Sequence, residues 1–407
     1  MSAESPPAEP KPSAGAAPAL ISVIFINMLG FGIVVPLLPF YAKSFDAPAW
    51  QIALIFSAYS LGAFFGEPFW GRLSDRIGRK PILIWTITGN CLCYLALAFA
   101  PNVYVAFLIR LAGGLASGNG SVIQGYIADV TPPEQRARRM AWMGAAWNFG
   151  LIIGPSVGGL FAHPDAGPIG FQIPLFIASG MSLLCATSIV LFIRESRVRT
   201  QLSEQQGSRW AVIGDVIRNP IVSRLMLVSF LVGCAFTGIE STFALWAQQR
   251  FDWGPRDIGV CFAVVGIGAG ITQMFVTGPL SERFGPGRML AVGMGITLVC
   301  ASLQPLSPHP WLTIGLMTLT AIGSSVAFPN IGAMISAAID PDRQGQTLGL
   351  NNAAGAMARV VGPLCAGLAF AEITIHAPFV MGALIQVAAL WIVINANRAV
   401  ARQARQG

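Results

Sequence analysis

The sequence predicts an all-α polytopic membrane protein with twelve transmembrane helices, arranged as two six-helix parallel repeats. Three observations predict this fold class. Of the 407 residues, 54% are hydrophobic and only 11% are Asp, Glu, Lys or Arg, whereas roughly 25% of an ordinary soluble domain is charged. Apolar stretches long enough to cross a bilayer recur along the chain, and polar motifs recur between its two halves. This composition excludes a soluble globular enzyme, a disordered chain and a coiled coil.

The chain begins with a stretch rich in Pro, Ala and Glu at residues 1–18. This stretch lacks the basic start and the cleavage site of a secretory signal, so we expect a disordered cytoplasmic tail. From about residue 19, apolar stretches of roughly 18 to 25 residues each match a helix that crosses a hydrocarbon core of about 30 Å. The predicted spans cover residues 19–41, 51–71, 81–100, 103–128, 141–162, 171–193, 222–247, 258–280, 288–305, 311–337, 347–370 and 373–396.

The longest polar stretch in the chain separates the first six predicted spans from the last six. We therefore expect an N-terminal six-helix bundle at 19–193, a cytoplasmic linker at 194–221, a C-terminal six-helix bundle at 222–396 and a cytoplasmic tail at 397–407.

The basic residues predict the orientation. All but five of the 25 Lys and Arg residues fall in the tails and in the loops on one side of the predicted spans. Lys43, Arg250 and Arg256 fall on the opposite side, and Arg110 and Arg359 fall inside helices. Under the positive-inside rule both termini are cytoplasmic. Because the positive charge is spread over these loops, the net charge of +7 does not indicate a nucleic-acid partner.

An internal repeat relates the two halves. The segment GRLSDRIGRK at residues 71–80 recurs as GPLSERFGPGR at 278–288, an offset of 207. The pair Gly154-Pro155 recurs as Gly362-Pro363, an offset of 208. Such offsets predict parallel repeats related by an axis along the membrane normal, with a binding site near the midplane between them.

These motifs resemble those of the major facilitator superfamily over essentially the whole chain after the tail, and in particular its twelve-span drug:proton antiporter branch, which includes tetracycline exporters. The residues that carry the resemblance are Gly71, Leu73, Ser74, Asp75, Arg76, Gly78, Arg79 and Lys80 after span two; Arg110, Gly114 and Gly118 in span four; Gly150, Gly154, Pro155, Gly158 and Gly159 in span five; and Gly30, Gly32 and Pro36 to Pro39 in span one.

The resemblance implies gating roles for two of these motifs. It implies that Asp75 holds span two against span eleven and releases it during transport. The other gating candidates in the same loop are Gly71, Arg76, Gly78 and Arg79. The alternative is that the charges of this loop only anchor it on the cytoplasmic side. The last two gating candidates are the Gly-Pro pair of span five. Gly154 and Pro155 allow a neighbouring helix to pack closely, and such a contact can prevent water from leaking between the two halves. The alternative is a kink that serves packing alone.

Four ionisable residues fall inside predicted spans. An unpaired charge inside the bilayer is energetically costly, so such residues are candidates for a functional role. They are Glu67, Arg110, Glu240 and Arg359, and their repeat positions in the other half are not ionisable. A carboxylate near a mobile arginine can bind and release a proton. We therefore predict a proton-coupling site led by Glu240, with Arg110 and Arg359 as charge partners. A static ion pair and a snorkelling side chain remain the alternatives, and Glu67 equally fits a hydrogen bond near the gate.

Polar and aromatic residues in the spans provide the candidates for substrate contact. Asn27 and Gln124 lie on spans one and four, which border the central cavity in the resembled family; for any single such residue, hydrogen bonding between helices is the alternative. Tyr126 and Phe236 can stack with a planar, partly apolar substrate. Tetracycline exporters usually carry an aspartate where this sequence has Asn27, so the resemblance does not carry their proton site or specificity to this position.

The expected function is secondary active transport: export of a small amphipathic, drug-like compound, with tetracycline as one candidate, in exchange for protons. Proton-coupled uptake of a small nutrient or metabolite is the alternative. No nucleotide-binding motif occurs in the sequence, so ATP is not the expected energy source. We expect no enzyme activity, cofactor or metal, and a monomer in the lipid bilayer of the bacterial inner membrane.

Overall fold

The computed structural model describes residues 16–117, 119–131, 146, 149–150, 152–196, 214, 219–339 and 344–403. Within these ranges the secondary structure is helical throughout, and no strand occurs in them. The predicted all-α fold class is therefore confirmed. Most of the predicted N-terminal tail and of the predicted linker lies outside the described residues.

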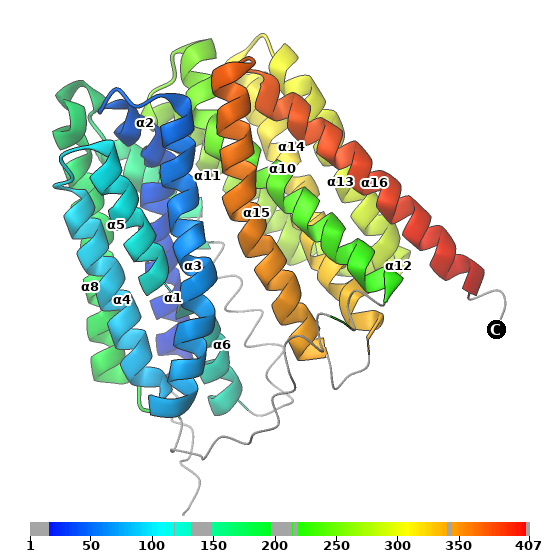
Figure 1. Ribbon diagram of the computed structural model, residues 1–407, viewed down its shortest axis with the longest axis horizontal. Helices are drawn as coiled ribbons and strands as arrows, with labels where there is room; N and C mark the ends of the chain where they lie inside the picture. Colours follow the sequence, from blue (N-terminus) through cyan, green and yellow to red (C-terminus); the bar gives the residue numbers. More distant parts are fainter. Residues whose placement is uncertain are drawn as a thin grey trace, which may run out of the picture.

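Figure 1 shows the helices in chain order. They are α1 (Ala16–Val34), η1 (Val35–Leu37), α2 (Leu38–Lys43), α3 (Ala49–Ile77), α4 (Arg79–Leu97), α5 (Val103–Ala116), α6 (Asn119–Val130), an unlabelled helix (Ile152–Phe161), η2 (Pro164–Phe171), α8 (Gln172–Phe192), α10 (Pro220–Phe251), α11 (Pro255–Ile271), η3 (Thr272–Thr277), α12 (Gly278–Phe284), α13 (Pro286–Leu303), η4 (Gln304–Leu306), α14 (Pro310–Ala337), α15 (Gln344–Glu372) and α16 (Ala377–Gln403).

Ten helices or helix runs in the described part of the chain are long and apolar enough to cross a membrane. Two shorter apolar helices, Val103–Ala116 and Ile152–Phe161, lie where the sequence predicts spans four and five. The chain is thus a multi-pass membrane protein, and the count of twelve crossing helices stays a prediction. The last helix, α16, continues to Gln403 and so passes the predicted end of the last span at 396.

Three predicted spans are interrupted where the sequence analysis expects continuous helices. In span one, Pro36 lies in the 3-10 turn η1 and Pro39 in α2, and proline cannot donate the backbone hydrogen bond that continues a helix. Span four divides into α5 and α6, and the Ser117 hydroxyl at the end of α5 donates to the Gly114 carbonyl (2.7 Å). Span eight contains the π-helical turn η3. Hydropathy cannot reveal such breaks, because it does not depend on the hydrogen-bond pattern.

The backbone repeats its special conformations at the predicted offset. Gly78 between α3 and α4 has a φ of 110°, and Gly285 between α12 and α13 has a φ of 84°. Both values lie in the left-handed region that favours glycine. Pro68 of α3 lies ten residues before Gly78, and η3 lies eight to thirteen residues before Gly285. The proline of α3 and the π-helical turn of span eight therefore occupy corresponding positions in the two repeats.

The buried apolar side chains form three clusters. We call the end of the molecule that carries Lys43, Arg250 and Arg256 the outer end, after the predicted orientation, and the opposite end the inner end. The largest cluster, at the outer end, combines residues of both bundles, from Tyr41 and Leu97 to Trp246. Of the other two, one contains only residues before 194 and the other only residues after 220. The bundles therefore share one core at the outer end and have separate cores at the inner end.

Figure 1 shows the same arrangement in the ribbon. Helices α3 and α15, one from each bundle, pack against each other and lie side by side near the outer end, and they diverge toward the inner end. The structure is therefore closed at the outer end.

Candidate functional site

Three of the four charged residues predicted inside the membrane lie in one cluster. Glu67 comes from α3, Glu240 from α10 and Arg359 from α15. The Arg359 guanidinium interacts electrostatically with both carboxyl groups. Its side chain is exposed, and the two glutamates are half-buried. Because α3 belongs to the first bundle and α10 and α15 to the second, a proton on either carboxyl group changes the attraction within or between the bundles.

The backbone that carries Arg359 is held from both sides. The Thr237 hydroxyl of α10 donates to the carbonyl of Ala358 (3.2 Å). The Ser57 hydroxyl of α3 donates to the carbonyl of Val360 (3.0 Å). These two carbonyls flank Arg359, so side chains of both bundles fix the α15 backbone at this position. The sequence analysis did not single out Ser57 or Thr237, since a small hydroxyl residue in an apolar helix carries no distinct signal.

The fourth predicted charge, Arg110, lies apart from this cluster. Its guanidinium lies over the ring of Tyr59, 4.5 Å from the ring centre, and it also interacts with Tyr94 of α4. The predicted partnership of Arg110 with Glu240 is not observed, because α5 directs the Arg110 side chain toward α3 and α4 within the first bundle. Tyr59 interacts electrostatically with both Arg110 and Glu67.

At the inner end, ion pairs tie the segment after α3 to the rest of the first bundle. Arg79 forms salt bridges with Asp75 (3.0 Å) and with Asp129 of α6 (3.2 Å). The Glu195 carboxylate, beyond the end of α8, accepts hydrogen bonds from the backbone N–H groups of Arg79 (2.8 Å) and Lys80 (3.1 Å). We call Asp75, Arg79, Asp129 and Glu195 the inner latch. These ion pairs lie within the first bundle, and the predicted latch of Asp75 against span eleven stays a prediction.

The other predicted gating residues of this segment shape its backbone. A Cβ atom at Gly78 would lie 2.5 Å from Oε2 of Glu195, so both the positive φ and the closeness of the carboxylate require glycine there. The Gly71 carbonyl accepts a hydrogen bond from the Ser74 hydroxyl (2.7 Å). The Arg76 side chain is exposed.

The Gly-Pro motif of span five forms a close contact with α11. A Cβ atom at Gly159 would lie 2.5 Å from the carbonyl oxygen of Pro255, and one at Gly259 would lie 2.7 Å from the carbonyl oxygen of Pro155. Gly154 contacts the backbone of α1 instead. We call the contact of Pro155 and Gly159 with Pro255 and Gly259 the outer seam. It joins the two bundles at the outer end and leaves no room for a side chain between the helices.

The predicted substrate contacts come from three helices and differ in exposure. Asn27 of α1 is buried, Gln124 of α6 is exposed and Phe236 of α10 is half-buried. The Phe236 ring meets the edge of the Phe328 ring, with centres 6.1 Å apart. Asn27 and Gln124 lie in the first bundle and Phe236 in the second.

Two aromatic residues serve the packing of the bundles. Tyr126 is only 1% exposed, and its hydroxyl donates to the carbonyl of Arg194 (2.7 Å) at the end of α8. This position does not support the predicted substrate contact. Trp246 is fully buried, and its Nε1 donates to Nδ1 of His376 (3.1 Å), in the loop between α15 and α16. The burial of the imidazole and the positive charge of Arg250 lower the pKa of His376.

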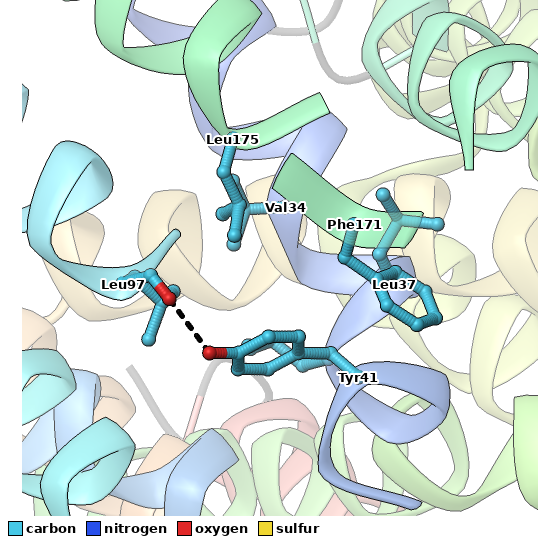
Figure 2. Close-up of a pocket in the computed structure, with 7 residues that line it drawn as sticks. Val34, Leu37, Tyr41, Leu97, Phe171 and Leu175 are labelled. Carbon is cyan, nitrogen blue, oxygen red and sulfur yellow. Dashed lines mark hydrogen bonds between the residues drawn. The ribbon is translucent and has the colours of Figure 1, made fainter. Parts of the chain in front are cut away.

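One cavity near the outer end is apolar. Figure 2 shows its lining, with the Tyr41 hydroxyl directed at the carbonyl of Leu97, to which it donates a hydrogen bond of 2.6 Å. The remaining lining side chains are Val34, Leu37, Leu38, Phe171 and Leu175. Because the hydroxyl is already bonded, no polar side chain here is free to orient a substrate. In the described ranges, no group of three or more His, Cys, Asp and Glu side chains is placed to hold a metal ion.

Comparisons with known proteins agree with this architecture. The family model of the Major Facilitator Superfamily matches residues 20–274 and 225–406. The class C tetracycline resistance protein of Escherichia coli is 29% identical over 355 residues, covering 85% of this chain and 87% of that protein. Multidrug resistance protein 2 of Bacillus subtilis (strain 168) is 26% identical over 378 residues, covering 91% and 92% of the two chains.

Two solved structures share the fold. The nucleoside transporter NupG superposes with a TM-score of 0.78 at 13% identity, covering 94% of this chain and 99% of the other. The human organic anion transporter MFSD10 gives a TM-score of 0.69 at 21% identity, covering 93% and 98%. With the family match extending over nearly the whole chain and a polytopic helical structure of the same architecture, this protein belongs to the Major Facilitator Superfamily and is a membrane transporter.

Proposed function

We propose that this transporter exports a small amphipathic compound in exchange for protons, by alternating access. The observation that carries the proposal is the cluster of Glu67, Glu240 and Arg359, in which one cation interacts with a carboxyl group of each bundle. The relatives named for tetracycline and multidrug resistance support a drug-like substrate.

The cluster suggests how proton binding is coupled to movement of the bundles. With both carboxyl groups ionised, Arg359 attracts Glu240 within the second bundle and Glu67 across the boundary. A proton that binds to the Glu240 carboxylate neutralises it and ends that attraction, which leaves Arg359 free to pair more strongly with Glu67. Release of the proton restores the first pairing. Proton binding therefore changes the electrostatic attraction between the bundles.

Because its outer end is closed, this structure corresponds to the cytoplasm-facing state of the proposed cycle. The shared core and the outer seam keep the bundles together at the outer end, so in this state substrate enters from the cytoplasm. Opening toward the outside requires the seam at Gly159 to separate and the bundles to close at the inner end, where the inner latch with Asp75 and Arg79 sets the shape of the segment after α3. We propose Asn27, Gln124 and Phe236 as substrate contacts.

The proposal is tested in inside-out membrane vesicles with an acidified lumen. A pH-sensitive dye reports proton release while tetracycline, a lipophilic cation and a neutral phenicol are added one at a time. We expect at least one compound to collapse the gradient in vesicles with the protein and not in vesicles without it. Glu240→Gln should abolish this effect, because a glutamine amide cannot carry the proton.

Glu372→Gln provides the matched control, because Glu372 is an exposed carboxylate at the outer end of α15. This variant should release protons as the wild type does. Unchanged release by Glu240→Gln would remove Glu240 from the mechanism. No release with any compound, in correctly oriented vesicles, together with accumulation of a solute in right-side-out vesicles, would replace export by uptake.

A further inference from the structure

Among the residues that the structure describes, none accepts a hydrogen bond from Nε of Arg110. Arg110 is only 4% exposed, and its side chain forms no hydrogen bond or ion pair with any residue that the structure describes. The Tyr59 ring face is its close electrostatic contact. A buried cation without a counter-charge or acceptor is strongly destabilised. The face of an aromatic ring stabilises a cation less than an anion would.

Further polar side chains line the same space. Arg110 lines a cavity together with Asn90 and Tyr94 of α4 and with Tyr59 of α3. Asn90 is 3% exposed and Tyr94 is 5% exposed. The free space in this cavity has room for about one water-sized particle.

The chemistry of this lining favours an anion. The guanidinium, the Asn90 amide and the Tyr94 hydroxyl all present donors, and the guanidinium adds a full positive charge. In the described residues, the carboxyl group nearest to these side chains by electrostatic interaction is Glu67, which acts on Tyr59 and interacts with Arg359. This small free space suits a monatomic ion better than a larger tetrahedral oxyanion.

We propose that the cavity between α3, α4 and α5 binds chloride, with Arg110 as the charge partner and Asn90 and Tyr94 as hydrogen-bond donors. The cavity lies within the first bundle, apart from the charge cluster of Glu67, Glu240 and Arg359. Chloride binding therefore does not depend on the proposed export or on its proton coupling.

The experiment uses the purified full chain in detergent, with chloride exchanged for gluconate at constant pH and ionic strength. We expect the thermal unfolding midpoint to rise saturably with chloride, and bromide-soaked crystals to show an anomalous peak beside Arg110. Arg110→Gln should abolish the chloride dependence. Arg359→Gln should retain it, and this variant is the matched control because it removes the other cation in the membrane interior.

Where Arg110→Gln does not fold, Asn90→Ala and Tyr94→Phe replace it. Each should raise the dissociation constant for chloride about threefold to tenfold, as expected for one lost hydrogen bond. The proposal is overturned by a wild-type midpoint that does not distinguish chloride from gluconate, or by crystals with water alone in the cavity. A chloride effect that Arg359→Gln removes and Arg110→Gln retains would also overturn it, because the ion would then bind at the charge cluster.

Discussion

The outer seam leads to a specific prediction. A methyl group added there would collide with backbone atoms, which cannot move aside as a flexible side chain can. In Gly159→Ala, the new Cβ would lie 2.5 Å from the carbonyl oxygen of Pro255 and 3.2 Å from Cα of Arg256. Ordinary van der Waals contact begins near 3.4 Å. Helix Ile152–Phe161 and α11 must therefore move apart by about 1 Å to accommodate the methyl group.

The size of the effect follows from overpacking. Inserting a methyl group into a tightly packed contact costs about 1–3 kcal/mol. This cost falls only on states in which the seam is closed, because separated helices have room for the methyl group. The ratio of outer-open to outer-closed molecules should therefore rise about 5- to 150-fold.

Hydrogen–deuterium exchange in lipid nanodiscs measures this ratio. We expect faster exchange in residues 152–161 and in the first turns of α11 in Gly159→Ala, with unchanged exchange around the inner latch. Gly180→Ala in α8 is the matched control, because no atom lies within 4 Å of a Cβ placed there. Since alanine favours helices over glycine by up to about 1 kcal/mol, the control should be as stable as the wild type or more stable.

Equal exchange of Gly159→Ala and Gly180→Ala at the outer seam would refute the reasoning. It would mean that the helices are not in contact at Gly159, or that their contact does not limit opening at the outer end. Slower exchange in Gly159→Ala would contradict the prediction more directly, since it would show that the methyl group fills a gap.

Three further predictions concern the inner end and the loop before α16. Glu195→Ala removes the acceptor of the first N–H groups of α4, so thermal unfolding should show a loss of about 1 kcal/mol, and an unchanged midpoint would contradict it. Tyr126→Phe should cost about 1 kcal/mol and leave compound-dependent proton release unchanged; loss of release at unchanged stability would instead indicate a substrate contact. His376 is neutral while it accepts from Trp246, and its pKa is lowered from 6.5 in the folded protein. Because the unfolded chain then binds a proton at higher pH, stability should be constant above pH 6.5 and fall as the pH drops from 6.5 through the lowered pKa. This decline should be smaller in His376→Gln, in which residue 376 does not titrate.

The sequence alone was sufficient for the fold class and for the charged residues worth examining. Bilayer thickness fixes the length of a spanning helix, so apolar stretches predict the spans without any knowledge of packing. Glu67, Glu240 and Arg359 stand out because a charged residue in an apolar span is costly and therefore informative.

Which residues meet was decided only by the tertiary structure. The sequence shows that Arg110 is embedded in a helix, but the rotation of α5 about its axis places the guanidinium on Tyr59 and away from Glu240. Tyr126 has the composition of a substrate contact, yet helix packing directs its hydroxyl to the backbone of Arg194. Hydropathy gives the position of a residue along a helix and leaves its direction open. The direction is fixed by how neighbouring helices pack, and packing depends on the shapes of all the side chains at each contact.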